Sequence, residues 1–301
     1  MQNILIIKTK ASGDVLRTTV LLHVLKGNIF WITDGYNIPL FPDHYPDLTL
    51  IPVESIPDEI FRLHFDIIIN LEEDTDLAKK VSLFQTKKII GVCWNNGLLD
   101  YSGDSAELYN MSLISKLPAS EANNLKRKNS FSYQEIICRM AGKAFSGEPY
   151  ILHSNKLLET FDRSKIGIEE RVGNRWPNKH WYGYQQLKNL LLKNNYGISV
   201  FEHRRELRQY MEDIQQCRLI ITGDTLAMHI ALGYQIPCIA IFNCTSPDEI
   251  YDYGILRKMI SPMLEKVFYN TQFLREATEA VSIDKVISTV YSELHTDIAK
   301  Y

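Results

Sequence analysis

The first residue placed to do chemistry is Asp14, which closes the stretch Thr9-Lys10-Ala11-Ser12-Gly13-Asp14 after an apolar, β-type run. Apolar residues with helical spacing follow, so Gly13 is predicted at a tight strand-to-helix turn and Asp14 in the first turn of the helix. Asp14 is either a carboxylate that caps the helix and complements its dipole, or a general base that needs a hydroxyl within about 3 Å. The turn has neither G-x-G-x-x-G nor a P-loop pattern, which argues against an NAD site and a P-loop.

A second candidate cluster begins where a predicted strand ends at Thr222. Gly223 allows the turn, and a helix is expected to begin near Thr225, after Asp224. Free backbone N–H groups between Thr222 and Met228 would form a seat for a diphosphate, with Thr225 adding a hydroxyl. His229 lies four residues after Thr225 on the same helix face, and is either a structural histidine or part of that site.

A third cluster, Arg171–Trp181, follows the first strand of the second half and places three cations beside the turn at Gly173. Cations here would neutralise a diphosphate leaving group, and an arginine would do so with two hydrogen bonds. Arg175 and Lys179 are the candidates for this role. The alternative is a solvated loop with a tryptophan packed beneath a helix.

Two charged runs need separate interpretation. Asp74-Thr75-Asp76 has the D-x-D spacing that holds a metal nucleotide in some glycosyltransferases. Because it lies within the acidic run Glu72–Asp76, we interpret it instead as the acidic start of a helix. We therefore expect no metal site. Leu125–Asn129 is typical of a solvated helix face, with an anionic acceptor as the alternative ligand.

Composition narrows the class of protein. The chain has 301 residues, 45% of them hydrophobic, which excludes intrinsic disorder and suggests two domains. A net charge of −3 gives no global attraction to nucleic acid or anionic lipid. Five cysteines without a paired C-x-x-C are expected to be reduced, and the first residues do not resemble a signal peptide. We expect a cytoplasmic protein with at most peripheral membrane contact.

The elements that must position these residues alternate between strand and helix, which predicts α/β architecture with parallel sheets. The expected strands are 3–8, 28–33, 48–51, 65–70, 88–93, 165–169, 197–201, 218–222, 236–242 and 266–269. The series stalls between about 95 and 159, so the linker is predicted at 152–163. We expect doubly wound domains at 1–157 and 158–270, and a terminal segment 271–301 with an amphipathic helix over 282–295.

Taken in order, these clusters resemble glycosyltransferase family 9, the heptosyltransferases of lipopolysaccharide assembly. The family's opening strand, Gly-Asp turn and helix resemble Ile4–Leu25. Its K/R-W-P segment is similar to Arg175-Trp176-Pro177, and its D-[ST]-G-x-x-H-x-A motif to Asp224–Ala231. A following strand and F-G-P-T turn are similar to Ile239–Thr245.

The resemblance implies a GT-B fold, with two Rossmann-like domains facing a central cleft and the terminal helix returning to the first domain. It implies inverting, metal-independent transfer of heptose from a nucleotide diphosphate sugar, ADP-heptose, to a lipopolysaccharide-type or other glycan or lipid-linked acceptor, without a cofactor. By resemblance Asp14 is the base in the acceptor-side domain, where Lys10, Ser12 and Gly13 line the cleft. The donor side is implied to comprise Thr222, Gly223, Asp224, Thr225, Met228 and His229, with Arg175 or Lys179 on the diphosphate.

The chain also departs from the family pattern. Leu226 stands where the family has Gly, and Asn243-Cys244 replaces Gly-Pro. The stretch 197–220 is short, and Glu202 is the candidate ribose contact within it. Two alternatives therefore stay open beside the transferase. One is a nucleotide-sugar epimerase, and the other is a degenerate protein that binds a nucleotide sugar or a partner without catalysis.

Overall fold

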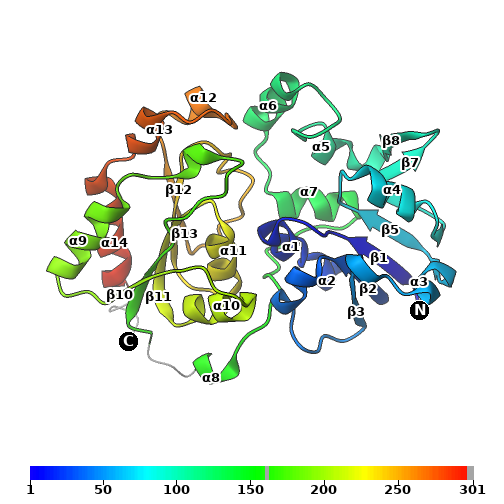
Figure 1. Cartoon of the computed structure of the whole chain (residues 1–301), viewed down its shortest axis with the longest axis horizontal. Helices are drawn as coiled ribbons and strands as arrows, with labels where there is room; N and C mark the ends of the chain where they lie inside the picture. Colours follow the sequence, from blue (N-terminus) through cyan, green and yellow to red (C-terminus); the bar gives the residue numbers. More distant parts are fainter. Residues whose placement is uncertain (160–162, 297–301) are drawn as a thin grey trace. The chain divides into compact units, whose positions relative to one another are not determined.

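A computed structural model describes residues 1–159 and 163–296, which divide into two compact units (Figure 1). The first unit comprises Met1–His153 with Asp248–Tyr251, and the second comprises Ser154–Pro247 and the chain from Asp252. The predicted linker 152–163 includes residues 160–162, which lie outside the described residues. Asp248–Tyr251 belongs to the first unit because Glu249 accepts the backbone N–H of Tyr133 and pairs with Lys126. The predicted domain 158–270 is wrong for this segment.

The first unit is built on a six-stranded sheet in the order β3-β2-β1-β5-β7-β8. Its strands are β1 (Asn3–Ile7), β2 (Asn28–Thr33), β3 (Leu48–Pro52), β5 (Ile67–Asn70), β7 (Ile89–Asn95) and β8 (Leu98–Tyr101), and only β8 pairs antiparallel among these described strands. The central strand β1 is fully buried over Ile4–Ile7, so helices must cover both faces of the sheet. They include α1 (Ser12–Thr18), α2 (Leu21–Val24), α3 (Asp58–Arg62), α4 (Thr75–Val81) and α7 (Tyr133–Met140).

Smaller elements complete the first unit. A two-stranded sheet joins β4 (His64–Phe65) to β6 (Gln85–Thr86), and α5 (Ala106–Tyr109) and α6 (Ala119–Lys128) precede α7. A capping box starts α7, where Ser132 and Glu135 satisfy each other's backbone N–H groups.

The second unit has a five-stranded, fully parallel sheet in the order β10-β9-β11-β12-β13. The strands are β9 (Lys165–Ile168), β10 (Ile198–Val200), β11 (Cys217–Gly223), β12 (Cys238–Phe242) and β13 (Leu256–Ile260). Helix α8 (Lys156–Glu159) precedes them in sequence, and α9 (Tyr184–Lys193), α10 (Leu207–Gln215) and α11 (Leu226–Gly233) lie between them. The predicted α/β class with parallel sheets is confirmed in both units.

Three sequence predictions fail at the edges of the sheets. The expected strand 266–269 is helical, as α12 (Leu264–Val267), because Val267 packs into a small core with Cys244 and Ala277. The last strand is β13 instead, whose mixed run Leu-Arg-Lys-Met-Ile suits an edge strand with alternating burial. Strand β8, which pairs antiparallel with the predicted strand β7, lies in the stretch where no further strand was expected.

The terminal helix belongs to the second unit. Helix α14 (Ile283–Thr296) follows α13 (Arg275–Glu279), and its apolar face, with Val286, Val290 and Leu294, is buried in one core with α9 and the sheet of the second unit. Arg257 on β13 also pairs with Glu293. The prediction that this helix returns to the first domain is therefore wrong for the described residues; 297–301 lie outside them.

Candidate functional site

The connection between β1 and α1 carries the candidates of the first unit. Ala11 is the N-cap of α1 with φ 59°, a left-handed conformation that residues with a side chain adopt rarely. Gly13 lies inside the first turn of α1. The prediction that Gly13 makes the tight turn is wrong, because Ala11 takes the left-handed position instead.

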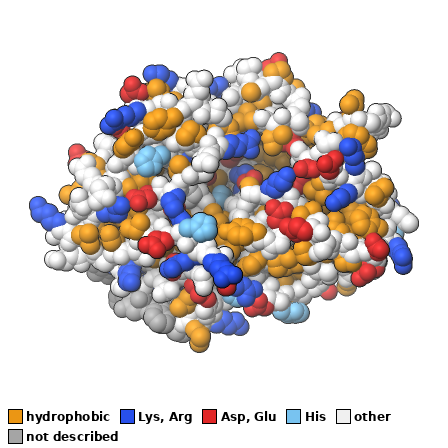
Figure 2. All heavy atoms as spheres, in the orientation of Figure 1, with side chains coloured by type: hydrophobic (Ala, Val, Ile, Leu, Met, Phe, Trp, Pro, Cys, Tyr) orange, Lys and Arg blue, Asp and Glu red, His pale blue; other side chains and the backbone are white. Residues whose placement is uncertain are grey.

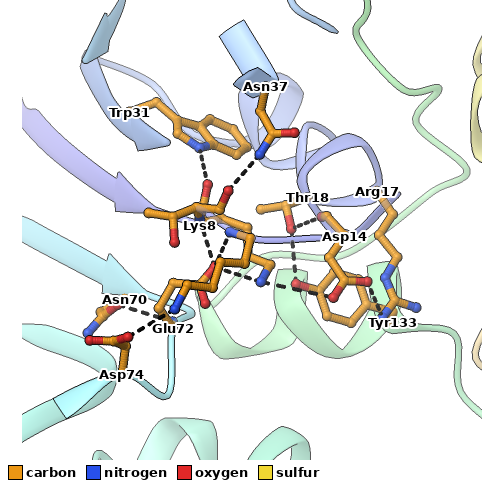
Figure 3. Close-up of polar contacts among 12 residues, drawn as sticks. Lys8, Asp14, Arg17, Thr18, Trp31, Asn37, Asn70, Glu72, Asp74 and Tyr133 are labelled. Atoms are coloured by element: carbon orange, nitrogen blue, oxygen red, sulfur yellow. Dashed lines mark hydrogen bonds and ion pairs between the residues drawn. The ribbon is translucent and has the colours of Figure 1, made fainter. Parts of the chain in front are cut away.

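Asp14 lies in the first turn of α1 between two cations (Figure 3). Its Oδ1 is 2.9 Å from the Arg17 guanidinium and its Oδ2 is 4.0 Å from Lys8 Nζ. The Asp14 side chain is 35% exposed, whereas those of Lys8 and Arg17 are largely buried. An ionised carboxylate is thus stabilised at this position and still open to solvent, as a group that exchanges protons with a substrate must be.

Glu72, two residues after the end of β5, contacts the same turn, and the sequence did not point to it as a site residue. Its Oε1 accepts hydrogen bonds from Lys8 Nζ at 2.7 Å, from the Thr9 N–H at 2.6 Å and from the Lys10 N–H at 3.0 Å. Burial alone would lower the pKa of Lys8, but the carboxylates of Asp14 and Glu72 outweigh it and raise that pKa. The available signal was an acidic residue two positions after the end of a strand that is largely apolar.

Arg17 is fixed by aromatic and polar neighbours. Its guanidinium lies 3.9 Å from the centre of the Tyr133 ring, and the Tyr133 hydroxyl contacts Thr18 Oγ1 at 3.0 Å. Burial acts to lower the pKa of Arg17, yet Asp14, Tyr133 and Glu249 together raise it. Arg17 therefore stays charged beside Asp14.

The predicted acceptor-side residues Lys10 and Ser12 have partners within the first unit. Lys10 Nζ lies 3.0 Å from Asp74 Oδ2, and Ser12 Oγ donates to Asn37 Oδ1 at 2.6 Å. Asn37 in turn donates to the Thr9 carbonyl at 2.6 Å. Asn37 thus supports the β1–α1 connection from the side of β2, and Asp74 supports it from the side of β5.

Asp74 is a helix cap, which agrees with the acidic helix start expected of the D-x-D pattern. Its Oδ1 accepts the N–H groups of Asp76 and Leu77 at the start of α4. The Leu77 N–H and Lys10 lower the pKa of Asp74. Across the described parts of the chain, no group of three or more His, Cys, Asp or Glu side chains is arranged to hold a metal ion.

In the second unit, Asp224 after β11 forms a largely buried ion pair with Lys179. Lys179 Nζ donates to the Asp224 carbonyl and to its Oδ2, both at 2.7 Å, and Thr245 Oγ1 donates to the same Oδ2 at 2.8 Å. Burial would raise the pKa of Asp224, but Lys179, His229 and these hydrogen bonds lower it well below its ordinary value. Thr245, which follows β12, was missed as a site residue.

The turn around this pair has little space. A Cβ on Gly223 would come within 3.3 Å of the Lys179 carbonyl oxygen, so a glycine suits the position. Thr222 Oγ1 and Thr225 Oγ1 lie 2.8 Å apart, and Thr225 is the N-cap of α11. The first turn of α11 therefore begins beside Asp224, as the sequence predicted.

Residues further along α11 are interior. The Met228 side chain is fully buried and His229 is 5% exposed. Met228 is thus placed to offer its backbone N–H, and its side chain belongs to the core. Leu226, where the family pattern has Gly, is half-buried at the first position of the helix.

The three cations of the Arg171–Trp181 segment, Arg171, Arg175 and Lys179, contact different groups. Arg171 makes two hydrogen bonds to the buried Glu169, at 2.9 Å from Nε and 2.6 Å from a terminal nitrogen. Arg175 is exposed and lies 5.1 Å from the centre of the Trp176 ring. Lys179 is the cation of this segment that binds Asp224, at the β11–α11 turn.

Further predicted features take less specific positions. Asn243, in place of the family's Gly, donates from Nδ2 to the His180 carbonyl at 2.7 Å and holds the Arg171–Trp181 segment near β12. Glu202 is exposed after β10. In the basic run of α6, Lys126 pairs with Glu249. Figure 2 shows that positively and negatively charged side chains are interspersed on the face that it draws.

Comparisons with known proteins agree with this arrangement. A model of glycosyltransferase family 9 (heptosyltransferase) matches residues 203–267, which include the β11–α11 turn and Thr245. A search of curated protein sequences finds no match. No helix among the described residues is both long and apolar enough to cross a bilayer.

Solved structures extend the likeness to nearly the whole chain. The Escherichia coli heptosyltransferase WaaC with ADP has a TM-score of 0.61 and 13% identity, covering 97% of this chain and 100% of that one. The E. coli ADP-heptose lps heptosyltransferase II has a TM-score of 0.63 and 15% identity, covering 99% of each chain. A family 9 glycosyl transferase from Veillonella parvula DSM 2008 has a TM-score of 0.66 and 14% identity, covering 98% of this chain and 97% of that one. Residues 203–267 are therefore similar to glycosyltransferase family 9, and the chain as a whole has the GT-B-like fold of these heptosyltransferase structures.

Proposed function

We propose that the protein transfers heptose from ADP-heptose to a hydroxyl of a glycan or lipid-linked acceptor, with inversion at the anomeric carbon. The observation that carries this proposal is the Lys179–Asp224–Thr245 cluster at the start of α11, because most of it falls in the range that matches family 9. ADP-heptose is the first donor to test, since the similar structures are a heptosyltransferase with ADP and an ADP-heptose heptosyltransferase.

The donor half of the proposal uses the N-terminus of α11. Backbone N–H groups in the first turn of a helix have no intrahelical partner and attract phosphate oxygens. Lys179 already faces Asp224, so this pair adds little net charge and serves to shape the turn. We assign the remaining positive charge near the diphosphate to Arg175, which is exposed.

The acceptor half of the proposal uses Asp14 as general base. The acceptor hydroxyl gives its proton to the Asp14 carboxylate while its oxygen forms a bond to the anomeric carbon. The bond between that carbon and the diphosphate oxygen breaks, and ADP leaves with the electron pair. Attack from the face opposite the leaving group inverts the configuration.

No divalent metal enters this scheme, because charge on the leaving ADP is met by helix N–H groups and cations. We infer that the protein works in the cytoplasm, with at most peripheral contact to a membrane. Its five cysteines are free thiols in the structure, which fits a reducing compartment.

Three measurements test the proposal. Calorimetry with ADP-, GDP- and UDP-sugars should show binding of ADP-heptose, and ³¹P NMR should show acceptor-dependent release of ADP that EDTA does not stop. Proton NMR of the product should show an inverted anomeric centre. Binding without ADP release would point to a non-catalytic protein, and binding of none of the nucleotide sugars would refute the donor assignment.

A further inference from the structure

The Glu72 carboxylate is buried in the first unit and accepts three hydrogen bonds. It is 6% exposed, and a single oxygen accepts the Lys8 ammonium and two consecutive backbone N–H groups. Its own N–H is held by Asn70 Oδ1 at 3.1 Å, and Asn70 Nδ2 donates to the Val92 carbonyl at 2.9 Å. Glu72 is thus anchored to the neighbouring strands β5 and β7.

This anchor sets the path of the β1–α1 connection. With the N–H groups of Thr9 and Lys10 bound to Glu72, the chain reaches the start of α1 through the left-handed Ala11. Such a conformation persists where surrounding contacts determine it. The position of Asp14, three residues later, follows from that path.

Charges around Asp14 come from every element packed near it. Lys8 at the end of β1 and Arg17 on α1 are cationic, while Glu72 after β5 and Glu249 of the 248–251 segment are anionic. Tyr133 on α7 is kept neutral, since burial raises its pKa above the ordinary value. Lys126 on α6 is paired with Glu249. Of these groups, Glu72 directly shares a cation with Asp14.

We propose that Glu72 is a positioning residue for the base: it fixes the β1–α1 connection and takes up the charge of Lys8 that Asp14 would otherwise face alone. This rests on the proposed role of Asp14. Lys8 Nζ lies 2.7 Å from Glu72 and 4.0 Å from Asp14, so Glu72 is its nearer partner. Because Lys8 is shared in this way, Asp14 stays basic enough to accept a proton from a hydroxyl.

Charge-changing variants test the proposal by the pH dependence of kcat/KM. Glu72→Gln keeps an oxygen for the two backbone N–H groups and removes the charge. Lys8 then acts on Asp14 alone, so the acid limb should move about one pH unit lower and kcat should fall about threefold to tenfold. Lys8→Met should move the limb upward, and the double variant should return it close to its wild-type position. An acid limb that stays in place in a folded Glu72→Gln or Lys8→Met variant overturns the proposal.

A direct readout separates this proposal from the proposed function. The carboxyl carbon of Asp14, assigned in NMR spectra by comparison with Asp14→Asn, should titrate at lower pH in Glu72→Gln than in the wild-type protein, whether or not sugar is transferred. Glu73→Gln is the matched control, because Glu73 holds Tyr101 and Ser115 instead. An Asp14 titration that is equal in Glu72→Gln and wild type overturns the positioning role, even if transfer activity is present. If neither the wild-type protein nor any variant transfers sugar, but Asp14 still titrates at lower pH in Glu72→Gln, the proposed function is refuted and the positioning role stands.

Discussion

Each unit has a Gly-Asp pair where a strand meets a helix, and the two aspartates have different environments. Asp14 lies inside the first turn of α1, 35% exposed, with Arg17 at 2.9 Å and Lys8 at 4.0 Å. Asp224 precedes α11, is 16% exposed, and receives hydrogen bonds from Lys179 and Thr245 on one oxygen. The first carboxylate is open to a substrate, and the second is occupied by the protein.

The difference teaches that the dipeptide does not decide the role of its aspartate. A carboxylate with two protein donors and a lowered pKa is a poor proton acceptor and a good structural clamp. A carboxylate beside cations and 35% exposed, as Asp14 is, can be reached by a hydroxyl from solvent. We therefore expect chemistry to depend on Asp14, and the shape of the donor turn to depend on Asp224.

The largest effect is expected at Asp14. Asp14→Asn keeps the size of the side chain and removes the base, so turnover should fall about 100-fold or more, the usual worth of general-base catalysis. Donor affinity measured by calorimetry should stay nearly unchanged. Turnover at the wild-type rate, with an acceptor that works, would show that Asp14 only complements the helix terminus. Asp14 and Asp224 would then both have structural roles.

Asp224→Asn should act mainly on stability. Removing the charge leaves Lys179 without its partner, and we expect a loss of about 2 kcal/mol in the free energy of unfolding at pH 7, below the 3–5 kcal/mol of fully buried pairs. Urea unfolding measures this loss. Because the pKa of Asp224 is lowered in the folded protein, its stabilising contribution is full above about pH 4 and declines as the pH falls further.

The difference in stability between wild type and Asp224→Asn should therefore narrow in acid. A constant difference down to pH 2 would show that the charge of Asp224 is not what stabilises the turn. Thr245→Val is a useful companion variant, since it removes one hydrogen bond to Asp224 and keeps the charge pair with Lys179.

Cations near the donor turn should have a moderate effect. Replacing Arg175 and Lys179 together by Ala should raise the Kd for the donor about tenfold at low ionic strength, with a weaker dependence on salt. Calorimetry at two salt concentrations measures both quantities. Lys193→Ala, at the exposed end of α9, is the control. An unchanged Kd in the double variant would show that Arg175 and Lys179 do not contribute to donor binding.

The smallest effect is expected at Asp74, a third carboxylate whose partners include backbone N–H groups. Asp74→Ala should cost about 1 kcal/mol of stability through loss of the cap, and Asp74→Asn should cost much less because Asn also caps helices. Thermal unfolding measures both. A metal-dependent activity that disappears in Asp74→Asn would instead support the D-x-D interpretation.

Sequence periodicity predicted most of the strands, and the position of Asp14 in the first turn of α1, because these depend on nearby residues. It failed for Gly13, since the left-handed position fell to Ala11, and for the strand expected at 266–269, where packing of Val267 favours a helix. It also failed for the terminal helix, because an apolar stripe shows that a helix is buried without showing against which surface.

The sequence by itself determined that both aspartates follow strands and stand at the beginning of helices. Only the tertiary structure decided their partners, because these come from distant parts of the chain. Lys8 meets Glu72 across 64 positions, and Lys179 meets Asp224 across 45. Parallel strands place their carboxyl ends at one edge of a sheet, where residues far apart in sequence come within hydrogen-bonding distance. The residues at these two edges, one in each unit, leave Asp14 35% exposed and Asp224 only 16% exposed.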